Sequence, residues 1–138
     1  MPITLRPALP LDIDALWALR TVAVRVGCAT HYAPEQIAVW TASPVPDAYA
    51  AMLVAGGGIV AMQGESIAGY AMLDVDKHEV DAVFVDPARA GLGIGKRLLA
   101  ALEQLARGRG IVRLHLSASL NAVPFYRAAG FVALREEA

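Results

Sequence analysis

The stretch that decides the fold reads VFVDPARAGLGIGKRLL and runs from Val83 to Leu99. It begins as an apolar β run, breaks at Asp86-Pro87, and continues through three alternate glycines into an amphipathic helix. Glycines let a backbone approach a ligand closely because they have no Cβ. The first turn of a helix also leaves unpaired N–H groups at the positive end of its dipole. The stretch therefore predicts a phosphate or pyrophosphate site at a strand–helix junction.

Two common phosphate motifs do not fit this stretch. A Walker loop has Ser or Thr after Gly-Lys, but here Arg97 follows Lys96, and Ala90 stands at the earlier glycine position. A dinucleotide fingerprint reads Gly-x-Gly-x-x-Gly, whereas these three glycines are spaced more closely. A glycine-rich turn without a ligand remains the plain alternative.

The stretch resembles the acyl-CoA-binding segment of the GNAT-type N-acetyltransferase superfamily, which reads Val-x-Pro and then Gln/Arg-x-x-Gly-x-Gly/Ala. Ala90 stands where that pattern has Gln or Arg, and Arg89 lies one place early. A second stretch, SLNAVPFYRAAGF from Ser119 to Phe131, is similar to the other hallmark, Asn-x-x-Ala-x-x-Phe-Tyr-x-x-x-Gly-Phe. Ser119 replaces the usual Asn, and Asn121 lies two places further on. Two hallmarks in this order make the resemblance specific.

The resemblance implies one α/β (α+β mixed) domain over residues 1–138 with the GNAT fold. We expect a central mixed, mostly antiparallel sheet of about six strands flanked by about four helices. The implied order is strand, two helices, three strands, helix, strand, helix, strand.

The patterning along the chain predicts compatible elements. Strands are expected at Ile3–Arg6, Ile59–Gln63, Ile67–Leu73, His78–Val85, Ile111–Leu116 and Phe131–Leu134. Helices are expected from Asp12 to Gly27, from Pro34, from an Asp47 cap to Leu53, from Gly93, and from a Ser119 or Asn121 cap to Gly130. The helix after Gly93 places Ile94, Leu98, Leu102 and Leu105 on one stripe. Gly69 inside a strand predicts a bulge or a close backbone approach.

Composition limits the class of protein. A chain of 138 residues with 57% apolar residues and a net charge of −1 has no basic surplus for nucleic acid or an anionic membrane. The longest uncharged apolar run, Ala48 to Met62, is interrupted by glycines and too short to span a bilayer. No signal peptide is visible, and the single Cys28 suits a reducing compartment, so we expect a cytoplasmic protein.

Acetyl-CoA is the cosubstrate that the resemblance implies, without a metal, and an amine acceptor attacks its thioester directly without an acyl-enzyme. The implied cofactor-binding residues are Val83, Phe84, Val85, Ala90, Gly91, Leu92, Gly93, Ile94, Gly95, Lys96, Ser119, Asn121 and Phe125. Tyr126 takes the position that protonates the leaving thiolate, for which a phenol with a pKa near 10 is a suitable acid. Its alternative is an ordinary core tyrosine. Cys28 has no predictable basic neighbour and is not expected to be a nucleophile.

The general base stays open at this stage. Counting back from the loop reaches Glu79, where some members of the family keep a catalytic glutamate, and Asp81 lies on the same face of the strand. His78 points to the other face and is a weaker candidate, and water could serve instead of any side chain. His31 and Tyr32 resemble acceptor-pocket residues of one GNAT subgroup, and simple packing is an equal alternative for both. For Trp40, packing is the preferred interpretation.

Competing functions are a CoA-binding module without catalysis and a structural domain that keeps only the fold. The expected partners are acetyl-CoA and the acceptor, with no nucleic acid and no membrane, and with a monomer or homodimer both possible. The chain stops soon after Phe131, so the last strand of many members has little room, and a partner subunit or an open edge could take its place.

Overall fold

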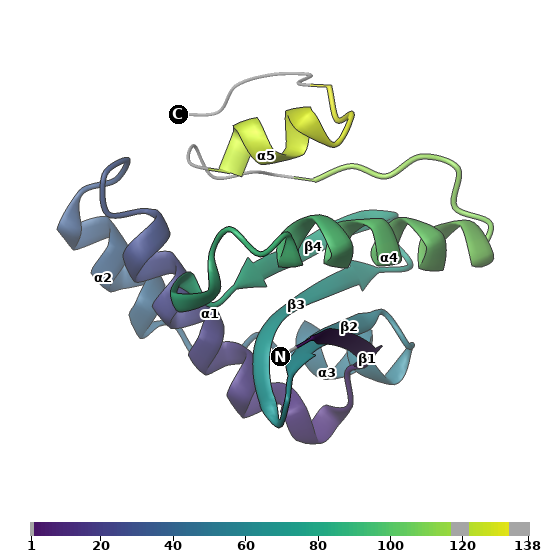
Figure 1. Cartoon of the computed structure of the whole chain (residues 1–138), viewed down its shortest axis with the longest axis horizontal. Helices are drawn as coiled ribbons and strands as arrows, with labels where there is room; N and C mark the ends of the chain where they lie inside the picture. Colours follow the sequence, from purple (N-terminus) through teal and green to yellow (C-terminus); the bar gives the residue numbers. More distant parts are fainter. Residues whose placement is uncertain (1, 117–121, 133–138) are drawn as a thin grey trace.

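The structure is a computed structural model that describes residues 2–116 and 122–132. Its described strands form one antiparallel sheet in the order β1-β2-β3-β4 (Figure 1). They are β1 (Ile3–Pro7), β2 (Gly58–Gln63), β3 (Ser66–Asp74) and β4 (Glu79–Val85). The strands predicted at Ile59–Gln63 and Ile67–Leu73 are confirmed and form a hairpin, with Gly64 at a φ of 63° in its turn. The antiparallel pairing agrees with the mostly antiparallel sheet that the resemblance implied, and short turns join β2 to β3 and β3 to β4.

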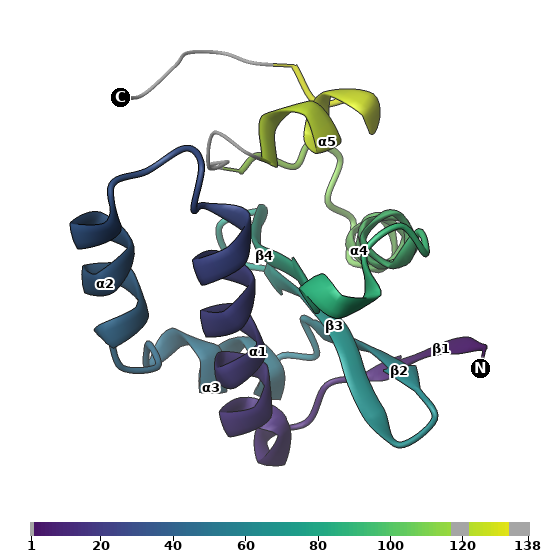
Figure 2. The same cartoon turned by 60° about the vertical axis from the view of Figure 1, so that its left-hand side comes forward.

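Helices cover both faces of the sheet (Figure 2). The first face carries α1 (Ile13–Gly27), which follows a 3₁₀ turn η1 (Pro10–Asp12), and α3 (Ala48–Val54). The helix α2 (Pro34–Ala42) packs on the outer side of α1. The second face carries α4 (Ile94–Gly108), and α5 (Val123–Ala128) lies above α4. A short turn, η2 (Pro87–Arg89), connects β4 to the loop before α4. Pro34 occupies the first turn of α2, as predicted.

The core beneath α4 is aliphatic. Leu98 and Leu102 are fully buried against Ala71 and Leu73 of β3, and Ile94 is 2% exposed. The predicted stripe is therefore confirmed, with Leu105 partly buried at its end. Each fully buried Leu or Ile side chain of this kind contributes about 1.5–3 kcal/mol to folding.

The core beneath α1 and α3 is aromatic. Trp17, Tyr49, Tyr70 and Phe84 form a series of ring contacts, with centroid distances of 5.4, 6.3 and 5.7 Å. We call this series the aromatic ladder. The Tyr49 and Tyr70 hydroxyls form a buried 2.8 Å hydrogen bond, which satisfies two polar groups that would otherwise be costly to bury.

Two register shifts disturb the sheet. One falls between Ala61 and Met62, opposite the segment around Gly69. A Cβ on Gly69 would lie 2.8 Å from the carbonyl oxygen of Phe84, so the predicted close backbone approach is confirmed. The other falls between Met72 and Leu73 and makes Asp81 an extra residue in β4.

The C-terminal third differs from the predicted strands. Instead of a strand over Ile111–Leu116, the structure has one isolated parallel bridge between Glu79 and His115. Phe131 and Val132 are not in a strand, and the rest of the predicted Phe131–Leu134 strand lies outside the described residues. The sheet therefore has four described strands where about six were expected. Asp47 stands at the N-cap of α3 but makes no side-chain cap bond.

Candidate active site

The junction between β4 and α4 is tied to β3 by its backbone. The N–H group of Asp86 donates to the carbonyl oxygen of Ala68 at 2.8 Å. Since N–H directions alternate along a strand, the N–H groups of Val83 and Val85 point away from β3, toward the free edge of β4. On that edge, the Val80 N–H donates to the His115 carbonyl at 2.9 Å. Beyond this bridge, no strand within residues 2–116 and 122–132 pairs with this edge of β4.

The loop before α4 needs glycine for its backbone conformation. Gly91 and Gly93 have φ values of 83° and 73°, in the left-handed region. No atom lies within 4 Å of a Cβ built on either residue, so the requirement is conformational and the space around them is open. The backbone of this loop is therefore accessible to a ligand.

The N-terminus of α4 presents amides without helical acceptors. Gly93 is the N-cap and makes no side-chain cap bond, and the first donor to its carbonyl is the Arg97 N–H at 3.1 Å. The N–H groups of Ile94, Gly95 and Lys96 precede that bond and lie at the positive end of the helix dipole. A Cβ on Gly95 would lie 3.4 Å from the Phe125 ring, so α5 closes directly over this first turn.

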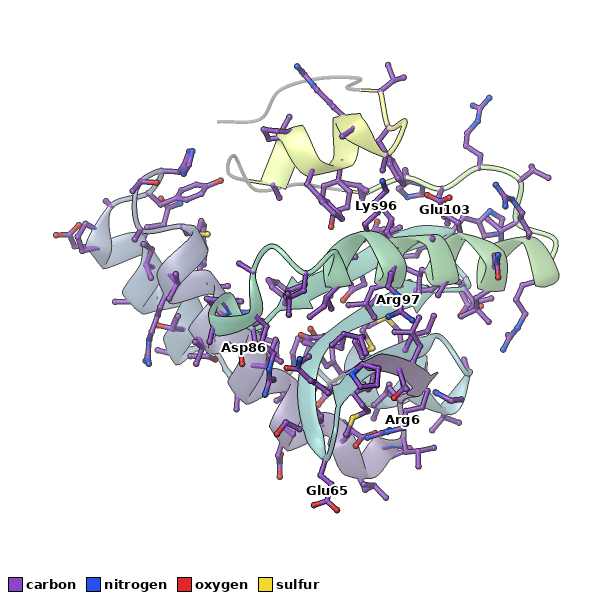
Figure 3. All side chains as sticks on the ribbon, in the orientation of Figure 1. Arg6, Glu65, Asp86, Lys96, Arg97 and Glu103 are labelled. Carbon is purple, nitrogen blue, oxygen red and sulfur yellow. The ribbon has the colours of Figure 1, made fainter. Side chains whose placement is uncertain are left out.

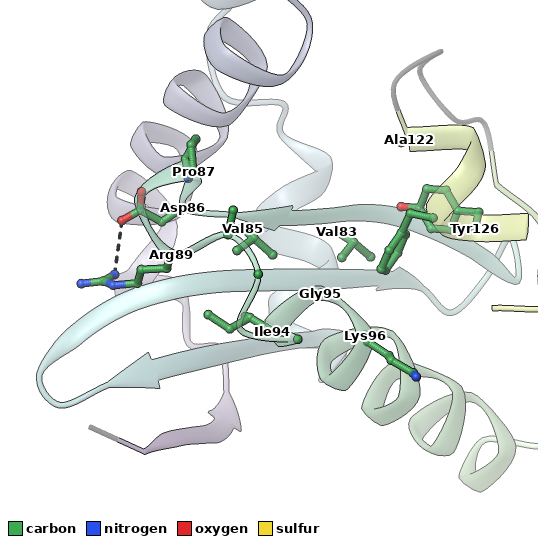
Figure 4. A pocket seen from close by; sticks show the side chains of 14 residues that line it. Val83, Val85, Asp86, Pro87, Arg89, Ile94, Gly95, Lys96, Ala122 and Tyr126 are labelled. Carbon is green, nitrogen blue, oxygen red and sulfur yellow. Dashed lines mark ion pairs between the residues drawn. The ribbon is translucent and has the colours of Figure 1, made fainter. Parts of the chain in front are cut away.

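An open cleft of about 420 Å³ lies between β4, the loop, α4 and α5 (Figure 4). Most of the predicted cofactor residues line it. They are Val83, Val85, Ala90, Gly91, Gly93, Ile94, Gly95, Lys96 and Phe125, and Tyr126, Ala122, Asp86, Pro87 and Arg89 complete the lining.

Four predicted cofactor residues are not among those lining residues. The Phe84 side chain packs on Tyr70 in the opposite core, so only its backbone could serve a ligand in the cleft. The Leu92 side chain is 54% exposed and does not line the cleft. Ser119 and Asn121 lie outside the described residues.

The three cations near the loop have different surroundings. Arg97 donates to the carbonyl oxygen of Ile3 at 2.9 Å and is turned toward β1 (Figure 3). Arg89 is held by Asp86 and by the carbonyl of Ile67. Lys96 lines the cleft, and within the described part of the chain no ion pair engages its ammonium group. Lys96 is therefore the cation most available to an anionic ligand.

Tyr126 lies at the α5 side of the cleft (Figure 4). Its ring contacts Phe125 and Phe131 edge-on, at centroid distances of 5.1 and 5.8 Å. Burial raises the pKa of Tyr126 to about 12, so the phenol stays protonated at neutral pH. The structure thus places a half-buried proton donor against the cleft.

The candidate bases lie near the start of β4, outside the cleft lining. Glu79 Oε2 lies 3.4 Å from Nε2 of His115, a residue that the sequence analysis did not single out. Partial desolvation of the Asp81 carboxyl, and after it the negative charge of Glu79, raise the pKa of Asp81. His78 has a φ of 53° and lies in the turn before β4, so it is not part of the strand that was expected to begin there. Glu79 and Asp81 thus lie close enough to influence each other.

The predicted acceptor residues lie on the connection between α1 and α2. Tyr32 contacts Trp40 edge-on at 4.7 Å, and His31 Nδ1 lies 3.1 Å from the Thr30 hydroxyl. Neither His31 nor Tyr32 lines the cleft. Their predicted role therefore stays a prediction.

Two kinds of feature are absent from the described residues. No helix in residues 2–116 and 122–132 has the length and apolar character to cross a membrane. Across the same residues, no group of three or more His, Cys, Asp or Glu side chains is arranged to hold a metal ion.

Known proteins resemble this chain along nearly its whole length. A GCN5-related N-acetyltransferase from Rhodopseudomonas palustris is 30% identical with a TM-score of 0.86, over 98% of this chain and 84% of its own. The PaiA N-acetyltransferase of Thermoplasma acidophilum, solved with coenzyme A, shares the fold at 21% identity and a TM-score of 0.85, over 99% of this chain and 94% of its own. The uncharacterized N-acetyltransferase YafP of Escherichia coli is 27% identical over 98% of this chain and 85% of its own. Shorter matches span only 35% and 49% of two other curated N-acetyltransferases.

The family described as the acetyltransferase (GNAT) domain matches residues 28–138, which include both hallmark stretches and the whole cleft. The resemblance that the two stretches carry is thereby confirmed, together with the fold it implied. This chain belongs to the GNAT acetyltransferase family.

Proposed function

We propose that acetyl-CoA binds in the cleft between β4, α4 and α5, and that its acetyl group passes to a primary amine by direct attack on the thioester. Acetyl transfer from acetyl-CoA to an amine is the reaction of the family. The observation that carries the proposal is the open first turn of α4, whose free amides and Lys96 meet a glycine loop at the cleft. An anionic pyrophosphate is the part of the cofactor that such a site suits.

The cofactor contacts follow from this placement. The N–H groups from Gly91 to Lys96 would hold the pyrophosphate, and Ala90 does not weaken that contact because the donors are backbone groups. The pantetheine arm would pair with the open edge of β4, where the Val83 and Val85 N–H groups point. The Val83 N–H would stabilise the oxyanion that develops on the thioester carbonyl. Ser119 and Asn121 stay proposed cofactor contacts on the resemblance alone.

Proton transfer needs an acid and a route for the proton of the amine. Tyr126, whose phenol carries its proton at neutral pH, would protonate the departing thiolate. The amine proton would leave through Glu79, Asp81 or water. The raised pKa of Asp81 makes its carboxylate a better proton acceptor than an ordinary aspartate. His31 and Tyr32 would bound the acceptor site from the connection between α1 and α2.

Isothermal titration with acetyl-CoA, CoA and 3′-dephospho-CoA tests the binding half of the proposal. We expect micromolar binding of acetyl-CoA and CoA with one site per chain. No detectable binding of any of the three would remove the acetyltransferase proposal.

A screen of amines with thiol release as the readout tests the catalytic half. We expect at least one amine to release CoA in a reaction that Tyr126→Phe slows. Tight CoA binding with no thiol release above background, equally in wild type, Tyr126→Phe and Glu79→Gln, would instead indicate a binding module without catalysis.

A further inference from the structure

Arg89 lies one position before the place where the family pattern has Gln or Arg, and the protein itself holds its side chain. Its Nη1 atom donates to the carbonyl oxygen of Ile67 at 3.0 Å. The same nitrogen lies 3.3 Å from Oδ2 of Asp86, an ion pair drawn as a dashed line in Figure 4. The guanidinium therefore joins the end of β4 to the start of β3.

Asp86 extends this connection through its other groups. Its Oδ1 atom accepts from the Ala88 N–H at 3.0 Å, which shapes the η2 turn. Its own N–H donates to the carbonyl of Ala68 at 2.8 Å. We call Arg89, Asp86 and the carbonyl of Ile67 the loop clamp. Charge-assisted bonds of this kind are stronger than neutral ones, and both side chains are less than a third exposed.

The loop that follows the clamp has few other supports. Gly91 and Gly93 adopt left-handed conformations with no atom within 4 Å of either Cβ position. Leu92 between them is 54% exposed. The position of the loop is therefore set at its two ends, by the clamp before it and by α4 after it.

We propose that Arg89 is a positioning residue: the loop clamp fixes the Gly91–Gly93 loop in the geometry that receives the pyrophosphate, and the guanidinium does not itself bind phosphate. This inference rests on the proposed function, since it assumes that acetyl-CoA occupies the cleft. Pre-ordering a loop strengthens binding because less conformational freedom is lost when the ligand arrives.

Direct phosphate binding by Arg89 is the competing role, and Asp86→Asn separates the two by the sign of its effect. Asn keeps an oxygen for the Ala88 N–H but loses the ion pair with Arg89. If Arg89 bound phosphate, removing the neighbouring negative charge would tighten acetyl-CoA binding. If the clamp positions the loop, the same substitution weakens binding.

The test is isothermal titration of acetyl-CoA into wild type, Arg89→Gln, Asp86→Asn and the double variant. We expect Kd to rise about tenfold in each single variant, as for the loss of one charge-assisted bond, and little further in the double variant. Stoichiometry should stay at the wild-type value. A merely structural role would instead lower the fraction of competent protein, and hence the stoichiometry, at unchanged Kd.

Arg97→Gln is the matched control, because Arg97 also donates to a strand carbonyl but outside the cleft lining. Its Kd for acetyl-CoA should equal that of wild type. Tighter binding by Asp86→Asn, or an unchanged Kd in Arg89→Gln, would overturn the clamp while leaving the proposed function intact. Absence of acetyl-CoA binding by wild type would overturn both.

Discussion

Neighbouring residues of β4 point to opposite faces of the sheet, and the two faces have different roles. Ala82 and Phe84 are packed into the core that contains the aromatic ladder, whereas Val83 and Val85 line the open cleft. On the packed face, the buried hydroxyls of Tyr49 and Tyr70 satisfy each other. Among the described residues, no buried side-chain nitrogen or oxygen atom lacks a hydrogen-bond partner. On the cleft face, backbone amides at the start of α4 have no helical acceptor.

This difference shows how a small domain separates stability from binding. The packed face can be closed and rigid because it carries no ligand, and the open face can keep unpaired donors because water replaces the ligand when the cleft is empty. Changes in the aromatic ladder should therefore alter the free energy of unfolding, and changes in the groups that face the cleft should chiefly alter binding or rate.

The largest expected effect is on the rate of Tyr126→Phe. Loss of a positioned proton donor should lower kcat by about 10²- to 10⁴-fold, measured by thiol release with an amine found in the screen. Acetyl-CoA should still bind, because the phenol is not among the proposed phosphate contacts. Since burial raises the pKa of Tyr126 to about 12, the alkaline fall in wild-type kcat should come well above pH 10. A kcat equal to that of wild type in this variant would contradict the role of Tyr126 as the proton donor of the cleft face.

The same substitution on the packed face should behave in the opposite way. Tyr70→Phe leaves the Tyr49 hydroxyl buried without its partner, so we expect a loss of about 1–3 kcal/mol in the free energy of unfolding. Urea denaturation measures this loss, and kcat of the folded enzyme should change little. Tyr126→Phe serves as the matched control for stability. Equal losses of stability in both variants would contradict the assignment of separate tasks to the two faces.

A pair of Gly→Ala substitutions tests whether the loop needs glycine for conformation rather than space. Gly93 and Gly108 both have open space at the Cβ position, but only Gly93 has a positive φ, of 73°. Gly93→Ala should cost about 1–2 kcal/mol of stability and weaken acetyl-CoA binding. Gly108→Ala at the end of α4 should be neutral or stabilising by about 0.5–1 kcal/mol. Thermal unfolding and titration of both variants give the comparison, which equal effects would refute.

The smallest expected effect concerns Arg6 and Asp12, away from the cleft. The hydrogen bond from Arg6, with distances of 2.9 Å to both carboxylate oxygens, lowers the pKa of Asp12. A lowered folded-state pKa means that the contribution to stability is present above the unfolded pKa, near 4, and is lost as pH falls through the folded pKa. Because Arg6 is 36% exposed, we expect about 1 kcal/mol or less. Urea unfolding from pH 6 to pH 2 should show this acid loss in wild type and less of it in Arg6→Gln.

Local pattern was enough to predict the strand–helix junction at which the cleft lies. The alternate glycines, the break at Asp86-Pro87 and the apolar stripe of the following helix act within one short stretch, and the structure confirms the helix and its buried face. The positive φ values of Gly91 and Gly93 were not predicted, because the glycines were interpreted only as space for a ligand. The close backbone approach at Gly69 was also predictable, because a glycine inside a strand usually marks a bulge or a place where another backbone comes close.

Features that depend on long-range register could not be predicted in the same way. The bulge that makes Asp81 an extra residue, and the bridge that brings His115 to Glu79, arise from pairing between distant segments. The partners of Arg89 belong to the same class, because Ile67 lies on another strand. The position of Phe84, by contrast, was predictable. Side chains alternate along a strand, so the Phe84 side chain points to the other face of the sheet from those of Val83 and Val85 and could not contact a cofactor on their face.

Amide hydrogen exchange with and without CoA tests the difference between the two faces most directly. We predict that CoA slows exchange at Gly91–Lys96 and along Val83–Val85, while peptides from α3 on the packed face exchange at the same rate in both samples. Binding of CoA with unchanged exchange at the start of α4, or with protection centred on α3, would contradict the placement of the cofactor in this cleft.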